Sequence, residues 1–258
     1  EKSVGPLGIA KRIRELKKTM SREESVFKIV EEIIHGKYAL TFNDVAEQAI
    51  RTALAILDEG VTVAPIQGIS SIKIRDNPDK TRHLAIYFAG PIRSAGGTEM
   101  GLIFVVADFV RRLLGLDRYK ATELEAKRFI EEIRVYEREV SRFQFKIPDE
   151  ELFNVIMKLP VEVNGVETDP VEVTSFRGLP RVETNRVRGG ALRAINDGLI
   201  GRANKVLKIV EKLGIEGWDW LRSIKKHESN SNNDVIDEEK ELMYMKDVVA
   251  GRPIFSFP

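Results

Sequence analysis

Residues 84–101 read LAIYFAGPIRSAGGTEMG and decide the local fold. The apolar run 84–89 predicts a buried strand, which the Gly-Pro pair after it ends. A second glycine pair then precedes an apolar pattern with helical spacing, which runs through Val110 and ends before Gly115. A strand, a tight turn and a helix start leave backbone N–H groups free to hold an anion, so this stretch predicts contact with a phosphate group.

The segment RVRGG at 186–190 repeats the form of RSAGG at 93–97, and we expect its helix to reach Leu213. In both segments an arginine precedes a glycine pair that opens a long helix, whose N-terminus carries about half a positive charge. If both turns face the same way, they would form a two-point grip on a phosphate backbone. The alternative is that the glycines only let two helices begin sharply or pack closely. The candidate nucleic-acid-binding residues are Arg93, Ser94, Gly96, Gly97, Thr98, Arg181, Arg186, Arg188, Gly189, Gly190 and Arg193.

The cations of the chain are unevenly placed, although its 258 residues carry a formal net charge of only +1. Between positions 177 and 208, Glu183 and Asp197 are the acidic residues among eight cations: Arg177, Arg181, Arg186, Arg188, Arg193, Arg202, Lys205 and Lys208. A polyanionic partner such as DNA requires a local excess of this kind. The alternative interpretation is a solvated helix face followed by a charged loop.

The composition excludes several kinds of protein and site. The chain has no cysteine, which excludes disulfides and thiolate metal sites, and its three histidines (His35, His83 and His227) are widely separated. No apolar run approaches the ~20 residues that a membrane span needs. Because no signal-peptide pattern is present either, we expect a cytoplasmic protein without membrane contact.

No catalytic centre is expected from the motifs of the chain. The first glycine turn lacks both the Gly-Lys-Ser/Thr ending of a P-loop and the G-x-G-x-x-G spacing of dinucleotide sites. Most acidic residues have the helical spacing of charged faces, and none forms a pair suited to a metal ion. We therefore expect no catalytic residue, no metal ligand and no cofactor in this chain.

Helical periods and short apolar runs alternate irregularly, which predicts an α+β fold with short, mostly antiparallel strands and no regular doubly wound sheet. A capping box at Ser21 and a cap at Asn43 predict two helices, and strands are expected at 61–66, 69–74 and 170–174. Asn164-Gly165 predicts a type I′ hairpin. The long helix that begins at Thr122 carries a narrow apolar seam for its own domain or for a partner helix: Phe129, Ile133, Tyr136, Val140 and Phe143.

The expected organisation is an N-terminal accessory domain at 1–224, a polar linker at 225–241 and the start of a further domain at 242–258. The accessory domain divides into a helical subregion at 1–60 and an α/β subregion at 61–224. We expect the chain to be a fragment of a longer protein, because it begins without methionine and ends within an apolar phrase.

Several phrases resemble the N-terminal region of the large subunit of archaeal DNA polymerase D, the family D replicative polymerase. In chain order they are SVGPLGIA at 3–10, AEQAIRTALAIL at 46–57, FAGPIRSAGGT at 88–98, VETNRVRGGA at 182–191, GIEGWDWL at 214–221 and AGRPIFSFP at 250–258. The resemblance implies a DNA-directed DNA polymerase with a large catalytic subunit and a small proofreading 3′–5′ exonuclease subunit. It also implies that the catalytic carboxylates, with their Mg²⁺, lie beyond this chain, so no catalytic residue carries over onto it.

Three functions follow as alternatives. The first is an accessory domain that contacts primer–template DNA and helps to assemble the polymerase, with the exonuclease subunit, a sliding clamp reached through the parent protein and self-association as further expected contacts. The second is a protein-interaction or oligomerisation module that does not bind DNA and uses the seam or another apolar surface. The third, a freestanding nucleotide-dependent enzyme, ranks last because neither a phosphate loop nor a catalytic cluster is present.

Overall fold

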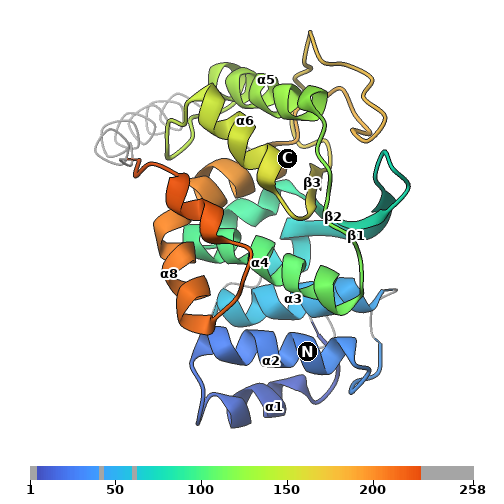
Figure 1. Cartoon of the computed structure of the whole chain (residues 1–258), viewed down its shortest axis with the longest axis vertical. Helices are drawn as coiled ribbons and strands as arrows, with labels where there is room; N and C mark the ends of the chain where they lie inside the picture. Colours follow the sequence, from blue (N-terminus) through green and yellow to red (C-terminus); the bar gives the residue numbers. More distant parts are fainter. Residues whose placement is uncertain (1–4, 41–43, 60–62, 228–258) are drawn as a thin grey trace, which may run out of the picture.

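The computed structural model describes residues 5–40, 44–59 and 63–227. Its first helices, α1 (Ile9–Leu16), α2 (Arg22–Ile34) and α3 (Val45–Leu57), are stacked at one end of the molecule (Figure 1). The capping box predicted at Ser21 is confirmed, because the Glu24 amide donates to the Ser21 hydroxyl and the Ser21 amide to the Glu24 carboxylate. The carboxylate of Asp44 caps α3, whereas Asn43, the predicted cap, lies outside the described residues.

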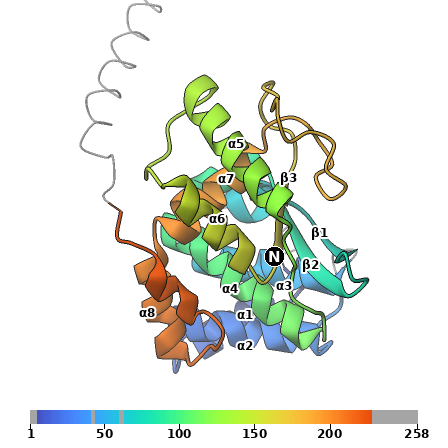
Figure 2. The ribbon, with the colours of Figure 1, turned by 45° about the horizontal axis from the view of Figure 1, so that its top comes forward.

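A small mixed sheet in the order β1-β2-β3 lies beside the helices (Figure 2). Strand β1 (Ile69–Asp76) pairs antiparallel with β2 (Arg82–Phe88), and β2 pairs in parallel with β3 (Glu162–Gly165). The predicted strands at 69–74 and 84–89 are confirmed, as is the α+β class. The strand predicted at 61–66 is wrong for its described residues, because Ala64–Gly68 form a π-helical turn, η1. Positions 61 and 62 lie outside the described residues.

The hairpin predicted at Asn164-Gly165 is wrong. All four residues of β3 are buried, and Val163 pairs in register with Ile86 of β2. Asn164 and Gly165 themselves pair with Tyr87 and Phe88 of β2, so the Asn-Gly pair lies within a strand and not in a turn. The stretch expected as a strand at 170–174 contributes only an isolated bridge between Glu172 and Arg186.

The central helix is α4 (Gly97–Leu113), which follows the 3-10 turn η2 (Gly90–Ser94). Eleven of its 17 residues are buried, and Gly115 follows it at a positive φ of 65°, as the predicted terminator requires. Helices α5 (Glu123–Glu139) and α6 (Asp149–Lys158) lie at the opposite end of the molecule from α1 and α2 (Figure 1). Together with α4 they form the crossover that makes the β2–β3 pair parallel.

The single helix predicted from Gly189 to Leu213 is wrong. The chain instead forms the short helix α7 (Gly189–Arg193), the π-helical turn η3 (Ala194–Ile200) and helix α8 (Ala203–Leu213). Two glycines explain the interruption: Gly201 lies directly on the ring of Phe145, and a Cβ at Gly198 would lie 2.7 Å from the Cβ of Met100 on α4. Packing against α4 and the Phe145 segment therefore overrides the helical period.

The apolar seam of α5 is part of the core. Phe129, Ile133, Tyr136 and Phe143 are buried, while Val140 is 38% exposed. The seam therefore packs within its own domain, and the alternative that it holds a partner helix is wrong for these four residues.

Trp218 is fully buried and its indole N–H donates to Asp108 Oδ2 at 3.2 Å, which ties the turn η4 (Asp219–Ser223) to α4. The core extends as one cluster from Ile9 to Ile224. No described helix has both the length and the apolar character that a membrane crossing requires. The domain boundaries stay predictions, and the predicted linker beyond His227 and the segment 242–258 lie outside the described residues.

Candidate nucleic-acid interface

The first glycine turn presents Arg93 to solvent. Turn η2 begins directly after β2, and the Ser94 hydroxyl folds back to donate to the Pro91 carbonyl at 2.9 Å. Arg93 is exposed and has no hydrogen bond or ion pair to any residue in the described part of the chain. Gly96 is exposed as well, while Gly97 and Thr98 are half-buried.

The N-terminus of α4 already faces two carboxylates of the protein itself. The Gly96 amide donates to Asp58 Oδ1 at 3.4 Å, and Glu99, in the first turn of α4, pairs with Arg22 at 3.3 Å. Burial raises the pKa of Asp58, and the neighbouring Glu99 raises it further. Negative charge at a helix N-terminus is favourable, but carboxylates in this position repel a second anion. A phosphate is therefore poorly accommodated at this end of α4.

The glycines of the first turn serve close packing. A Cβ at Gly97 would lie 2.9 Å from Nε of Arg202, the residue before α8. A Cβ at Gly96 would meet the Glu99 carboxylate, the free end of a flexible side chain. This geometry favours the packing interpretation over the phosphate cradle for this turn.

The two glycine turns lie against each other. The backbone of Gly190 directly contacts the carbonyl oxygen of Ala89, and the Gly189 amide donates to Thr168 Oγ1 at 3.1 Å. A small hollow between the turns is lined by Gly90, Arg93, Tyr136, Thr168, Asp169, Gly189 and Arg193. The two turns are therefore adjacent, but their surfaces face each other and include the Asp169 carboxylate.

Arg188 is buried inside the molecule, which corrects its assignment as a DNA contact. Its Nη2 lies 2.8 Å from Oε1 of Glu132, its amide donates to Oε2 of the same carboxylate at 3.0 Å, and its Nη1 donates to Asn164 at 2.8 Å. Arg128, also buried, donates to Glu132 at 2.6 Å. A buried carboxylate needs such partners, so the three residues form a structural unit.

Arg181 and Arg193 are also engaged by the protein. Arg181 binds the Glu125 carboxylate through Nε and Nη2, with the shorter contact at 2.5 Å. Arg193 pairs with Asp197 at 2.7 Å and lies over the Phe143 ring. Arg186 stays 50% exposed, with a 3.2 Å contact to Glu167. Among the candidate arginines, Arg93 and Arg186 are thus the two that remain accessible.

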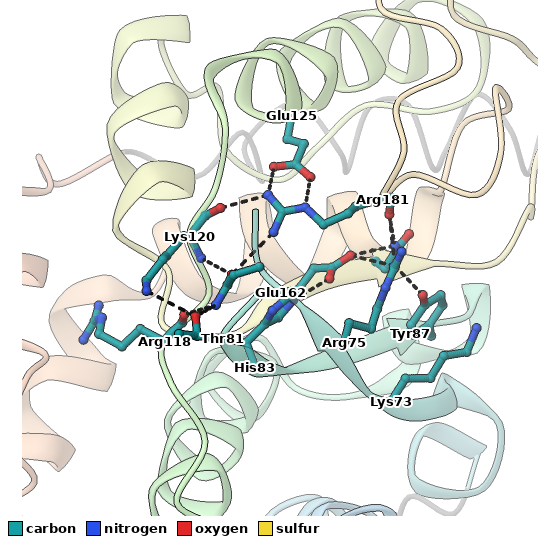
Figure 3. Close-up of polar contacts among 12 residues, drawn as sticks. Lys73, Arg75, Thr81, His83, Tyr87, Arg118, Lys120, Glu125, Glu162 and Arg181 are labelled. Atoms are coloured by element: carbon teal, nitrogen blue, oxygen red, sulfur yellow. Dashed lines mark hydrogen bonds and ion pairs between the residues drawn. The ribbon is translucent and has the colours of Figure 1, made fainter. Parts of the chain in front are cut away.

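Sequence reasoning missed a polar network that holds the loop at 166–188 over the sheet (Figure 3). Buried His83 lies 2.7 Å from Glu162, which also accepts from Arg75 at 3.0 Å. Arg75 donates in turn to the Tyr87 hydroxyl and to the Arg181 carbonyl. These residues come from distant parts of the chain, so no local pattern signals the network.

The cations around this network are neutralised by nearby carboxylates. Lys73 contacts Glu183 at 3.3 Å, and Lys120 lies between Asp79 and Asp117. A hydrogen bond from Tyr87 lowers the pKa of Glu183, and burial raises the pKa of Tyr87. This surface carries both signs of charge in close pairs and is a weak attractor for a polyanion.

An apolar groove of about 590 Å³ lies between α2, the end of α4 and the end of α8. Its apolar lining consists of Met20, Phe27, Phe109, Leu213 and Ile215, with the rings of Phe27 and Phe109 in edge contact at 5.3 Å. Within the described ranges, no group of three or more His, Asp or Glu side chains is placed to hold a metal ion.

Comparison with known proteins gives a consistent result. The family model for the N-terminal part of the DNA polymerase II large subunit DP2 matches residues 1–227. DNA polymerase II large subunits of Methanothermobacter thermautotrophicus, Methanosphaera stadtmanae and Pyrococcus horikoshii are 47%, 46% and 43% identical to the chain. The alignments cover 99%, 99% and 100% of the chain, but 24%, 24% and 20% of the respective relatives. The chain thus spans about a quarter of the length of these relatives or less.

Proposed function

The chain belongs to the family of DNA polymerase II large subunits, whose N-terminal region it matches, and on this premise we propose that it is a DNA-contacting and assembly part of an archaeal family D replicative polymerase. The single observation that carries this proposal is the continuous similarity over 99% of the chain to the large subunit of such a polymerase. The described residues contribute a packed scaffold with exposed cations.

In this proposal the whole polymerase extends DNA from a primer–template, with Mg²⁺ at carboxylates outside this chain. Its expected partners are the primer–template, a small proofreading exonuclease subunit and a sliding clamp reached through the rest of the large subunit. It would work in the cytoplasm, where an archaeal chromosome lies.

The test is binding of the 258-residue chain to a fluorescent primer–template, followed by anisotropy as salt is raised. We expect measurable affinity at low salt and a linear fall of log K with log salt, because phosphate contacts release counterions. No binding at about 50 mM salt, where electrostatic association is strong, would contradict a DNA-contacting role.

A second candidate function is assembly without DNA contact, and the groove between α2, α4 and α8 favours it. Phe27, Phe109 and Leu213 are only partly buried there, and another subunit of the polymerase would cover them. Light scattering of the chain alone and with the small subunit tests this function. A stable complex that ignores DNA supports it, and a monomer that binds no subunit argues against it.

A further inference from the structure

Helix α8 carries three lysines in a line on its outer side. Lys205, Lys208 and Lys212 follow the i, i+3, i+7 spacing, which places them within an arc of about 60° on a helix with 3.6 residues per turn. All three are exposed, whereas Val206 and Val210 on the opposite side of α8 are buried. Both ribbon views show α8 at an outer edge of the molecule (Figures 1 and 2). We call these three residues the lysine stripe.

The lysine stripe is not neutralised by the surrounding protein. None of its ammonium groups has a hydrogen bond or ion pair to another residue of the described ranges 5–40, 44–59 and 63–227. Glu211, on the same helix, pairs with Arg222 at 2.7 Å. Glu24 is held by Ser21 in the capping box, which lowers the pKa of that carboxyl, with a smaller contribution from Lys212. The stripe therefore keeps its positive field toward solvent.

Arg202 extends the stripe toward the first glycine turn. It lies directly before α8, donates to Gln144 at 3.0 Å and stacks over the Phe145 ring, without a carboxylate partner among the described residues. Gly97 of the first turn packs against its side chain. The cations of α8 thus continue to the turn that also presents exposed Arg93.

The spacing of the stripe suits a nucleic-acid backbone. Lys205 and Lys212 are seven positions apart, which is about 10 Å along a helix axis at 1.5 Å per residue. One DNA strand presents a phosphate about every 3.4 Å along the duplex axis, so the stripe spans about three phosphates. Lysine acts as a flexible point charge without geometric selectivity, which suits contacts that position DNA without reading its sequence.

We propose that the lysine stripe, with Arg202 at its end, binds the phosphate backbone of duplex DNA, and that the glycine turns do not. This proposal rests on the proposed function as a DNA-contacting part of a polymerase. The proposal moves the expected DNA contact from the arginines at 181–193 to helix α8. Those arginines are paired with carboxylates: Arg181 with Glu125, Arg188 with Glu132 and Arg193 with Asp197. The lysines of α8 have no such partners among the described residues.

Helix α1 provides a matched control. Lys11 and Arg14 of α1 and Lys18, just beyond its end, have the same i, i+3, i+7 spacing and are exposed. Carboxylates lie close to this group, because the neighbouring cations are paired: Arg12 binds Glu32 and Glu15, and Lys17 binds Glu59. Removing Lys11, Arg14 and Lys18 therefore takes away three exposed charges at another place on the surface, where more carboxylates lie nearby than around α8.

The experiment compares the wild-type chain, K205Q/K208Q/K212Q and K11Q/R14Q/K18Q on a fluorescent DNA duplex between about 50 and 200 mM salt. We expect the α8 variant to lose at least about tenfold in affinity and the slope of log K against log salt to fall in magnitude by about two to three. The α1 variant should change both quantities much less. Circular dichroism confirms that the exposed substitutions leave the fold intact.

Each outcome has a distinct meaning. If the wild-type chain does not bind DNA at all, the proposed function itself fails. If the wild type binds and the α8 variant matches it in affinity and slope, only the lysine stripe proposal fails. Equal losses in the α8 and α1 variants also overturn it, since binding is then a diffuse effect of net charge. Loss of small-subunit binding with unchanged DNA affinity would assign the stripe to a protein partner instead.

Discussion

Arg188 and Glu132 form an ion pair that lies wholly inside the molecule, with the Nη2–Oε1 distance at 2.8 Å and side-chain exposures of 1% and 0%. Glu132 comes from α5, and Arg188 lies at the end of the loop that crosses it. The carboxylate also holds Arg128, which donates to the carbonyl oxygens of Phe176 and Thr184. One buried carboxylate thus ties helix α5, strand β3 and the loop at 166–188 together.

Replacing Arg188 by alanine should destabilise the fold by about 3–5 kcal/mol, because it leaves a buried carboxylate without one of its partners. The same change at Arg186, which is half exposed and pairs with Glu167, should cost less than about 1 kcal/mol. Urea denaturation of both variants measures the difference. Similar costs at the two positions would contradict the structural role of Arg188. Loss of DNA binding in an Arg188→Glu variant would consequently report unfolding and not a lost contact.

The contrast between these arginines shows how far the sequence alone predicts this site. Apolar runs bounded by glycine predict the strand at 84–89 and the helix before Gly115, and the spacing of Ser21 and Glu24 predicts the capping box, because short-range geometry determines all three. The burial of Arg188 depends instead on its ion pair with Glu132, which is 56 positions away in the sequence. Counting cations along the chain identifies a basic segment, but only the fold shows which of those charges are already paired.

Long-range packing also explains the errors in the elements. Gly201 against Phe145 and Gly198 against Met100 interrupt a helical period that is continuous in sequence. The Asn-Gly pair of β3 has the composition of a hairpin turn, yet it is buried beside β2. In each case a contact with a distant segment outweighs a local preference of about 1 kcal/mol or less.

The two glycine turns should respond differently to an added methyl group. Gly190→Ala places a Cβ against the Ala89 carbonyl, which is backbone and cannot move aside, so we expect a loss of at least about 2 kcal/mol. Gly96 has a φ of −61°, and a methyl group there meets only the movable Glu99 carboxylate, so Gly96→Ala should change stability by less than about 1 kcal/mol. Thermal unfolding measures both.

The Gly96→Ala variant also separates the packing interpretation from a phosphate cradle. If the turn packs but binds no phosphate, its affinity for a DNA duplex should equal that of the wild type. A marked loss of DNA affinity in a stable Gly96→Ala protein would restore the phosphate interpretation for this turn.

Glu131 holds the loop at 166–188 from the exposed side of α5. Its carboxylate accepts backbone N–H groups of Thr174, Ser175 and Phe176 at 2.7, 2.7 and 2.9 Å. Burial raises the pKa of this carboxyl, but the three backbone hydrogen bonds outweigh it and the net pKa lies below the usual value. Glu131→Gln should therefore speed hydrogen exchange of these amides and cost about 1–3 kcal/mol. Unchanged exchange at the three amides would show that the other contacts of the loop hold it without Glu131.

Glu32 should make the stability of the N-terminal helices depend on pH. Hydrogen bonds from Arg12, together with those from Lys37 and Tyr38, outweigh burial and lower the pKa of Glu32 to about 2. A carboxyl with a lowered pKa in the folded state contributes stability that is complete above its unfolded pKa of about 4.5. This contribution is lost as the pH falls toward about 2, because the folded state then binds the same proton as the unfolded chain.

Glu32→Gln should consequently lower the free energy of unfolding by about 1–2 kcal/mol at neutral pH, and the difference from the wild type should shrink steadily as the pH falls through this window. Glu15→Gln is the matched control, since Glu15 contacts the same Arg12 at 3.7 Å from an exposed position and should change stability little at any pH. Urea titrations of the three proteins across the window measure both effects. A constant difference between wild type and Glu32→Gln at all pH values would mean that the substituted amide merely packs less well, and that the Arg12–Glu32 pair does not link folding to protonation.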